Sequence, residues 1–394
     1  MIAASFRPTV QDLASQLVAW RRHLHQYPEL GFQEQRTAEF ISSHLTRWGI
    51  PHETGIAHTG IVATIQGSRP GKTLAIRADM DGLPIQEENP VAYRSQVPQR
   101  MHACGHDGHT AIAMGTAYLL HQRRYELAGT VKVIFQPAEE SPGGAKPMIE
   151  AGVLAGVEGM VGLHLWNNLP LGTIGVKSGP SMANADRFHI EVLGKGGHGA
   201  MPHQTIDALV VGSQIVNALQ TIVSRSVDPL CPAVVTVGKF QAGDTFNVIA
   251  PRADLWGTVR TLDAETAERI PRRIEDVVAG ICQAHGALFR LHYERTYPLV
   301  NNHPQMAALV EQAVRLTLGA EARVVPEVTM GGEDMAFFLQ QVPGCYFFLG
   351  SANADLGLDL PHHHPCFDFD ESALPLGVEL FLRCTELFLG AALS

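Results

Sequence analysis

The chain has 394 residues, which at roughly 150 residues per domain predicts two or three domains, each large enough to bury its own core. Hydrophobic residues make up 45% and charged residues 17%, a balance typical of a folded globular protein rather than a disordered one. The net charge is −10 and no run is rich in lysine and arginine, which argues against a protein that binds nucleic acid or an anionic membrane surface. We therefore expect small molecules as partners.

The sequence favours a cytoplasmic location. No apolar stretch reaches the roughly 18 residues of a membrane helix, since Glu379 and Arg383 interrupt the apolar C-terminal segment. Residues 1–11 are broken by Pro8 before a signal-peptide core can form. Six cysteines scattered over a long chain favour free thiols or a ligand over a disulfide framework.

The first part of the chain predicts strands that alternate with helices. Apolar residues recur at helical spacing in 13–24 and 40–48. Short apolar runs and further helical patterns follow. The runs are 61–66, 73–77, 131–135 and 160–165, and the helical patterns are 110–124 and 145–151. This alternation predicts an α/β sheet domain whose chemistry lies where strands lead into loops.

The pattern changes near residue 186. The expected elements are a strand at 188–193, a helix at 205–224, strands at 233–240 and 254–261, a helix at 264–285 and a strand at 287–293. This βαββαβ order is the split ferredoxin-like plan. A helix at 305–318, a strand at 345–350 and a helix near 372–389 then resume the first style. We therefore expect a domain of residues 186–296 inserted into a discontinuous α/β catalytic domain made of 1–185 and 297–394.

The segment from Met101 to His109 concentrates three histidines, a thiol and a carboxylate in a predicted loop with two glycines. Cys104 and His106 are good ligands for borderline divalent metals, and Asp107 is suited to orient an imidazole. A cysteine–histidine nucleophile pair is the other functional interpretation. A loop of solvated histidines at the start of a helix is the interpretation without function.

Acidic and imidazole side chains also follow or interrupt other apolar runs. Glu139 and Glu140 are adjacent at a strand end, where like charges repel unless a cation lies between them or a proton is shared. His164 stands inside an apolar strand, and His363 stands in a run of three histidines. Taken singly, the two glutamates are a solvated pair, His164 is a core histidine and the three histidines form an exposed loop. Taken with residues 101–109, they predict a dinuclear metal centre.

Seven stretches, in order, resemble the metal-dependent amidohydrolases that include hippurate hydrolase, bacterial N-acyl-amino-acid amidohydrolases and plant indole-acetyl-amino-acid hydrolases. The stretches are RRHLHQYPELGFQE (21–34), RADMDGLP (77–84), MHACGHDGH (101–109), FQPAEE (135–140), GLHL (162–165), GKGGHGAMPH (194–203) and HHPCFDFDE (363–371). The resemblance implies a two-metal catalytic domain and an inserted domain used for dimerisation. It also implies hydrolysis of the amide bond of N-acyl-amino acids, including hippurate-like, N-acetyl and indole-acetyl conjugates, to a carboxylic acid and a free amino acid.

Residue by residue, the resemblance implies metal ligands for two divalent ions and a general base at Glu139. The implied ligands are Cys104, His106, Glu140, His164 and His363. Among the three adjacent histidines we choose His363, because the family's ligand stands two residues before the proline. Asp79 and Cys104 occupy positions where the wider superfamily has His and Asp. This donor set leaves both Mn²⁺ and Zn²⁺ as candidates.

The implied mechanism divides the chemistry between ions and side chains. Two ions that share a water lower its pKa from about 16 toward about 7, and Glu139 takes the water proton and passes it to the leaving amine. Asp81 is a candidate carboxylate that orients a ligand or its partner. Arg260 and Asn247 resemble the family's positions for the amino-acid carboxylate, although Arg260 is equally a surface strand arginine.

His198 stands in a glycine-rich loop, Gly194 to Gly199, which would let its side chain reach outward. A solvated loop histidine is the simpler interpretation. The resemblance implies a homodimer or higher homo-oligomer in which this histidine crosses the subunit interface and stabilises the carbonyl oxygen of the substrate.

Three rival functions remain at the level of the sequence. A dipeptidase or carboxypeptidase on the same scaffold would cleave the same amide. A metal-binding protein without turnover would not require the base Glu139. A cysteine hydrolase built on Cys104 would need neither the two glutamates nor His363.

Overall fold

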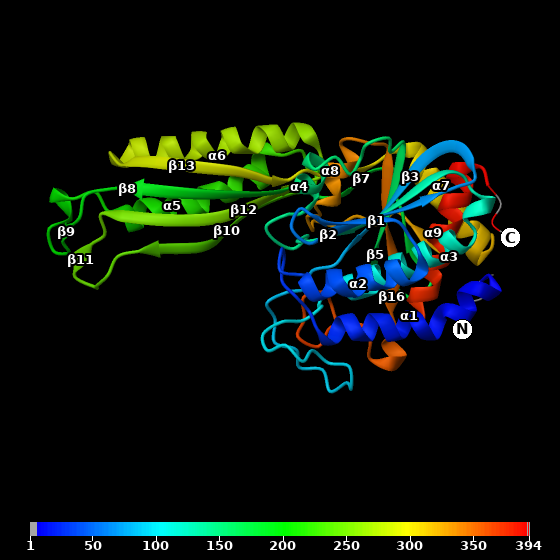
Figure 1. The fold of residues 1–394 in the computed structure, drawn as a ribbon. Coiled ribbons are helices and arrows are strands. Elements are labelled where there is room, and N and C mark those ends of the chain that lie inside the picture. Colours follow the sequence, from blue (N-terminus) through cyan, green and yellow to red (C-terminus); the bar gives the residue numbers. More distant parts are fainter. Residues whose placement is uncertain (1–5, 392, 394) are drawn as a thin grey trace. The chain divides into compact units, whose positions relative to one another are not determined.

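The computed structural model describes residues 6–391 and 393, and this part of the chain forms two compact units (Figure 1). Unit 1 comprises the chain up to Gly179, Asn301–Glu327 and the chain from Asp334 onward; unit 2 comprises Pro180–Val300 and Val328–Glu333. The insertion predicted at 186–296 falls within the longer segment of unit 2. Its limits as a domain stay a prediction.

A large mixed sheet forms the centre of unit 1. In the described residues it has eight strands in the order β1-β2-β4-β3-β5-β16-β6-β15. Strands β4, β3, β5 and β16 are parallel neighbours, so their carboxyl ends lie along the same edge. The strands are β1 (His52–Ile56), β2 (Gly60–Gln66), β3 (Arg69–Asp79), β4 (Ala128–Gln136), β5 (Gly159–Pro170), β6 (Ile174–Gly175), β15 (Val324–Val325) and β16 (Gly344–Ala352).

Helices cover this sheet and complete the core of unit 1. Helices α3 and α9 pack on the central strands and α1 packs on both of them, while α7 contacts α9 and β16. Strand β4 buries every side chain from Val133 to Gln136, as is usual for parallel strands covered on both faces. The helices are α1 (Pro8–Gln26), α2 (Gln35–Trp48), α3 (His106–Gln122), α4 (Ala145–Glu150), α7 (Pro304–Leu318), α8 (Met335–Leu339) and α9 (Ala373–Leu389).

Unit 2 has the βαββαβ order expected from the sequence. Within residues 180–300, four antiparallel strands form a sheet in the order β10-β12-β8-β13, and α5 and α6 pack on it. Along β8, Phe188 and Ile190 are buried and His189 between them is half-buried, the alternation of a sheet with helices on one face. The elements are β8 (Ala185–Leu193), α5 (Ala208–Thr221), β10 (Ala233–Ala242), β12 (Arg252–Thr261), α6 (Ala264–His285) and β13 (Leu288–Tyr297).

Short elements that the sequence did not predict lie at the ends of the larger ones. The short pairs are β9 (Gly197–His198) with β11 (Val248–Ile249) and β7 (Gly179–Met182) with β14 (Val300–Asn302). The remaining turns are η1 (Arg124–Glu126), η2 (Pro202–Gln204), η3 (Ile222–Ser226) and η4 (Ala354–Leu356). No helix among the described residues combines the length and the apolar character that crossing a membrane requires.

Candidate metal centre

Four segments of unit 1 bring the predicted ligands together. They are the chain after β4, the chain that leads into the start of α3, the middle of β5 and the chain after β16. Their ligand atoms form overlapping groups, and the atoms of each group lie within 4.8 Å of one another. Three of these groups combine Cys104, His106 and His164; Cys104, Glu140 and His363; and His106, Glu139 and Glu140. Because the groups share residues, the cluster offers two adjacent sets of ligand atoms, as two neighbouring ions would need.

Gly105 explains how the Met101–His109 motif folds. Its φ of 92° lies in the left-handed region, which lets the chain turn from Cys104 directly into α3. His106 and His109 therefore lie in the first turn of the helix. The prediction that the whole motif forms a loop was wrong for this second half, because Gly105 ends the loop earlier than the spacing of apolar residues indicated.

The two ring nitrogens of His106 have the surroundings that the nitrogens of a metal ligand need. Its Nδ1 lies 3.3 Å from Asp81 Oδ1, while its buried Nε2 has no hydrogen-bond partner among the described residues. Burial alone would lower the pKa of His106, but the charges of Asp79 and Asp81 raise it to about 10. An imidazole that donates from one nitrogen to a carboxylate and leaves the other nitrogen bare is the usual arrangement of a metal ligand.

His164 and Cys104 face each other beside it. His164 Nδ1 donates to the carbonyl oxygen of Leu165 at 2.6 Å, and its Nε2 lies 3.5 Å from Cys104 Sγ. Burial, and then the negative charges of Glu140 and Glu139, hold the pKa of the Cys104 thiol well above its ordinary value. A divalent cation among these groups would oppose both effects, since a coordinating thiol is deprotonated.

Asp81 fixes the turn that carries the two glutamates. Its Oδ1 accepts the Glu139 N–H at 3.0 Å and its Oδ2 accepts the Glu140 N–H at 3.1 Å. Ala138, just before them, has a φ of 54°, a left-handed conformation that alanine adopts at an energetic cost. The Glu139 side chain is buried, whereas the Glu140 side chain is half-buried.

The structure separates the roles of two adjacent histidines. His363 Nε2 lies 3.1 Å from Glu140 Oε1, and the His363 N–H donates to Ala103 O at 2.7 Å. His362 instead accepts the Asn167 N–H at 3.1 Å and stacks on Trp166 with 4.7 Å between ring centres. Burial lowers the pKa of His362 to about 3. Of the two, His363 is therefore the one that reaches the cluster.

His109 is near the cluster but already has two partners. Its Nδ1 donates to Asp79 Oδ1 at 2.6 Å, and its Nε2 accepts the Leu165 N–H at 2.8 Å. The other oxygen of Asp79 accepts from Arg77 at 2.7 Å. Burial would raise the pKa of Asp79, but His106, Arg77 and His109 hold it well below its ordinary value. His109 and Asp79 therefore hydrogen-bond to each other and to the residues around the cluster.

The donor set of the cluster fits divalent metal ions. It offers the bare Nε2 of His106, a second imidazole nitrogen of His164, a thiol and carboxylate oxygens within one small volume. Imidazole and thiolate suit Zn²⁺, and carboxylates also accept Mn²⁺. The residues present therefore fit the two ions that the sequence predicts, without deciding between the two metals.

The predicted residues of unit 2 lie at opposite ends of its sheet. His198 pairs with Val248 in the β9–β11 ladder, and the Gly199 N–H donates to Asn247 O at 2.8 Å, so His198 and Asn247 share one loop pair. Arg260 stands near the far end of the ten-residue strand β12, a strand length of about 30 Å. Within one chain, the structure does not bring Arg260 to the other two.

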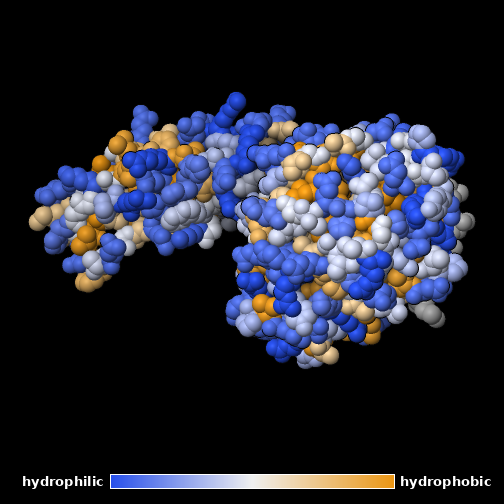
Figure 2. Space-filling view, viewed as in Figure 1, coloured by the Kyte–Doolittle hydropathy of each residue, from blue (hydrophilic) through white to orange (hydrophobic). Residues whose placement is uncertain are grey.

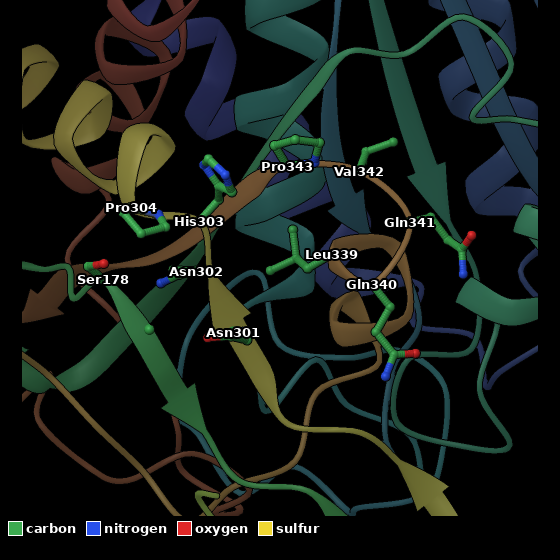
Figure 3. Close-up of a pocket in the computed structure, with 11 residues that line it drawn as sticks. Ser178, Asn301, Asn302, His303, Pro304, Leu339, Gln340, Gln341, Val342 and Pro343 are labelled. Carbon is green, nitrogen blue, oxygen red and sulfur yellow. The ribbon is translucent and has the colours of Figure 1, made fainter. Parts of the chain in front are cut away.

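The pocket drawn in Figure 3 is a separate feature of unit 1. Its volume is about 420 Å³, and it lies where the chain before α7 meets the chain after α8. The lining residues are Ser178, Gly179, Asn301, Asn302, His303, Pro304, Leu339, Gln340, Gln341, Val342 and Pro343. This lining contains none of the predicted ligands and neither a carboxylate nor a thiol, so it does not suit a divalent ion.

Two buried residues near the cluster were missed at the sequence level. The Arg77 guanidinium donates to Asp334 Oδ1 at 2.9 Å as well as to Asp79. The Asp334 N–H in turn lies 3.4 Å from Glu139 Oε1. The available signal was Arg77 itself, an arginine within an otherwise apolar strand, because a buried charge requires a buried partner.

Comparison with known proteins identifies the family. Residues 75–387 match the family described as peptidase family M20/M25/M40. An N-acyl-L-amino acid amidohydrolase of Geobacillus stearothermophilus is 47% identical over 303 residues, which cover 76% of this chain and 82% of that protein. Thermostable carboxypeptidase 1 of Saccharolobus solfataricus is 39% identical over 372 residues, covering 93% of this chain and 94% of that protein.

A solved structure agrees with this assignment. The YXEP protein of Bacillus subtilis, described as a dinuclear metal binding peptidase from the M20 family, aligns with a TM-score of 0.84 and 37% identity over 97% of this chain and 100% of that one. The chain belongs to peptidase family M20/M25/M40, and within it the chain is a metal-dependent amidohydrolase. The family predicted from the seven sequence motifs is confirmed.

Proposed function

We propose that this enzyme hydrolyses the amide bond of N-acyl-amino acids at a centre of two divalent metal ions. The observation that carries the proposal is the buried cluster of Cys104, His106 and Glu140 with Glu139 beside it. The similarity to an N-acyl-L-amino acid amidohydrolase supports the substrate class. The acyl group, whether benzoyl, acetyl or indole-acetyl, stays open, and so does the choice between Mn²⁺ and Zn²⁺.

The proposed ligands are the five residues predicted from the sequence. They are Cys104, His106, Glu140, His164 and His363. When bound, the two ions would acidify a water and polarise the amide carbonyl. Glu139 would take a proton from the attacking water and deliver it to the leaving nitrogen, as a general base and then a general acid. Asp81 holds the backbone of Glu139 in place for both transfers.

We propose that the active site is completed by a second subunit. His198 and Asn247 lie together on exposed loops of unit 2, whereas Arg260 lies at the other end of β12. If all three act on one substrate, a partner chain supplies the first two. His198 then stabilises the oxyanion, and Asn247 and Arg260 bind the amino-acid carboxylate.

The surface of unit 2 is consistent with such a homodimer. Strand β10 is an edge strand of the sheet, and edge strands are natural sites of pairing with another chain. Apolar side chains are exposed near it, and Figure 2 shows apolar groups among the hydrophilic residues of this unit. The exposed side chains include Leu209, Val210, Phe240, Phe246 and Val248. The cytoplasmic location expected from the sequence stays a prediction.

A second candidate function is that of a carboxypeptidase or dipeptidase. The similarity to thermostable carboxypeptidase 1 over 93% of this chain favours it. The two functions differ on the carbonyl side of the scissile bond, where a dipeptide carries a free α-ammonium and an N-acyl-amino acid carries an uncharged acyl chain. The scissile amide and the C-terminal carboxylate are the same.

The test is a substrate panel on enzyme stripped by a chelator and reconstituted with Mn²⁺ or Zn²⁺. Hippurate, N-acetyl-amino acids, indole-acetyl-amino acids and dipeptides with the same C-terminal residue are compared by release of the free amino acid. We expect metal-dependent turnover, with kcat/KM highest for an N-acyl-amino acid. A clear preference for the dipeptides would replace the proposal with the second function, and turnover that survives chelation would refute both.

A further inference from the structure

Arg21 lies in the C-terminal part of α1, where its completely buried guanidinium meets three carboxylates. Nε donates to Asp107 Oδ2 at 2.8 Å and one terminal nitrogen donates to Asp368 Oδ1 at 2.7 Å. The other terminal nitrogen donates to Glu371 Oε1 at 3.1 Å. Each of the three guanidinium nitrogens of Arg21 therefore donates a hydrogen bond to a carboxylate.

These carboxylates belong to two of the chain segments that carry ligands of the cluster. Asp107 follows His106 directly in the first turn of α3. Asp368 and Glu371 lie in the segment that begins with His363. Apart from Arg21, a backbone hydrogen bond from the His363 N–H to the residue before Cys104 also joins the segments.

The carboxylates are held from their other sides as well. The oxygen of Asp107 that contacts Arg21 also lies 2.8 Å from His25 Nδ1. The second oxygen of Asp368 accepts the Tyr93 hydroxyl at 2.6 Å. The planar fork of Arg21 thus connects two rigidly held anchors, and a lysine ammonium on a flexible stem would not match all of them at once.

We propose that Arg21 is a positioning residue that sets the distance between the Cys104 loop and the His363 segment, and so the affinity of the site for its metal ions. The inference rests on the proposed metal ligands. Cys104 and His363 belong to one candidate ligand group with Glu140, so a change in the spacing of their segments acts directly on that group. Residues that orient metal ligands typically change metal affinity by about 10–100-fold when they are mutated.

The test compares Arg21→Lys with a matched variant, Arg7→Lys. Arg7 is also a buried arginine of unit 1, and it pairs with Glu379 at 2.7 Å and Glu386 at 2.6 Å, away from the ligand segments. Metal-free proteins are titrated with Zn²⁺ against a chromophoric chelator, bound ions per chain are counted, and melting temperatures are recorded. We expect Arg21→Lys to lower the affinity for at least one of the two ions by about 10–100-fold. We expect Arg7→Lys to lower only the melting temperature.

Wild-type affinity for both ions in folded Arg21→Lys, or an equal loss of affinity in Arg7→Lys, would overturn the inference and leave Arg21 with a purely structural role. If Arg21→Lys does not fold, Asp368→Asn removes one anchor and is judged by the same criteria. His363→Ala separates the hypothesis of the metal centre from the hypothesis that Arg21 positions its ligands. If His363→Ala loses an ion and neither Arg21→Lys nor Asp368→Asn changes affinity, only the inference fails. If the wild-type chain binds no ion, the proposed metal centre fails and the inference fails with it.

Discussion

The carboxylate of Asp81 accepts a hydrogen bond from the backbone N–H of Glu139 at 3.0 Å. The same carboxylate accepts the Glu140 N–H and lies 3.3 Å from His106 Nδ1. One side chain thus holds the proposed general base and two proposed ligands, from β4 and α3, in a fixed arrangement. The sequence predicted Asp81 only as a residue that orients a ligand, and its assignment to catalysis stays a prediction.

Asp81→Asn tests this arrangement. The asparagine Nδ2 cannot accept an N–H, so at least one of the two backbone hydrogen bonds is lost and the turn at Glu139 loosens. We expect turnover or metal affinity to fall by about 10–100-fold while the melting temperature changes little. Steady-state kinetics and metal analysis of the purified variant check this. Wild-type values for both quantities would remove Asp81 from the site.

Glu139→Gln and Glu140→Gln divide the roles of two neighbours. Glutamine is nearly isosteric with glutamate but accepts no proton, so Glu139→Gln should keep both ions and lose about 10²–10⁴-fold in kcat. Glu140→Gln should bind metal more weakly because a charged ligand becomes neutral. Elemental analysis and kcat are measured for both proteins. If both retained metal and near-normal turnover, the mechanism would be abandoned.

His363→Gln and His362→Gln form a second matched pair. His363 contacts Glu140, whereas His362 accepts a backbone N–H and stacks on Trp166. A glutamine at 362 can still accept that N–H through its amide oxygen. We expect His363→Gln to bind fewer ions per chain and His362→Gln to bind the wild-type number. The reverse result would move the ligand to His362.

The sequence was most informative where short motifs follow apolar strands. The expected βαββαβ order is present in the structure. The strands that lead toward Asp81 and Glu139 are present as well, because buried parallel strands read as continuous apolar runs. Helix boundaries were less certain. The start of α3 depends on the left-handed conformation of Gly105, which apolar spacing does not encode.

The partners of buried charged residues could not be predicted from the sequence. Arg21 contacts Asp368 and Arg77 contacts Asp334, pairs that are separated by 347 and 257 residues. No local periodicity relates such positions, since they meet only after the sheet and its helices have packed.

Glu34 is a buried carboxylate that helps to hold the turn that carries Glu139 and Glu140. Its Oε1 accepts the N–H of Ala138 at 2.9 Å and its Oε2 accepts the Thr59 hydroxyl at 2.7 Å. Burial raises the pKa of Glu34 from its ordinary value near 4.5 to about 7, although the hydrogen bonds from Thr59 and Ala138 oppose the shift. Folding therefore favours the protonated form of Glu34.

This pKa predicts a pH dependence with a definite sign. Between the unfolded pKa and about 7 the folded state binds more protons than the unfolded state, so the free energy of unfolding falls as pH rises. The slope from one group is at most about 1.4 kcal/mol per pH unit. Urea unfolding of metal-free wild-type and Glu34→Gln protein from about pH 4.5 to 8 isolates this contribution by difference. A difference that stays constant over the range would show that Glu34 does not titrate there.

Complementation between two inactive chains tests whether His198 acts across a subunit interface. Glu139→Gln lacks the proton carrier and His198→Ala lacks the proposed oxyanion donor, so each homodimer should be nearly inactive. In a mixed dimer, the site that keeps its own Glu139 receives His198 from the other chain. Random exchange makes about half of the dimers mixed, each with one intact site, so activity should recover to about a quarter of wild type. Differently tagged chains and native mass spectrometry verify the exchange. Activity that stays at the level of the separate homodimers, despite mixed dimers in the sample, would place His198 in its own subunit's site or outside catalysis.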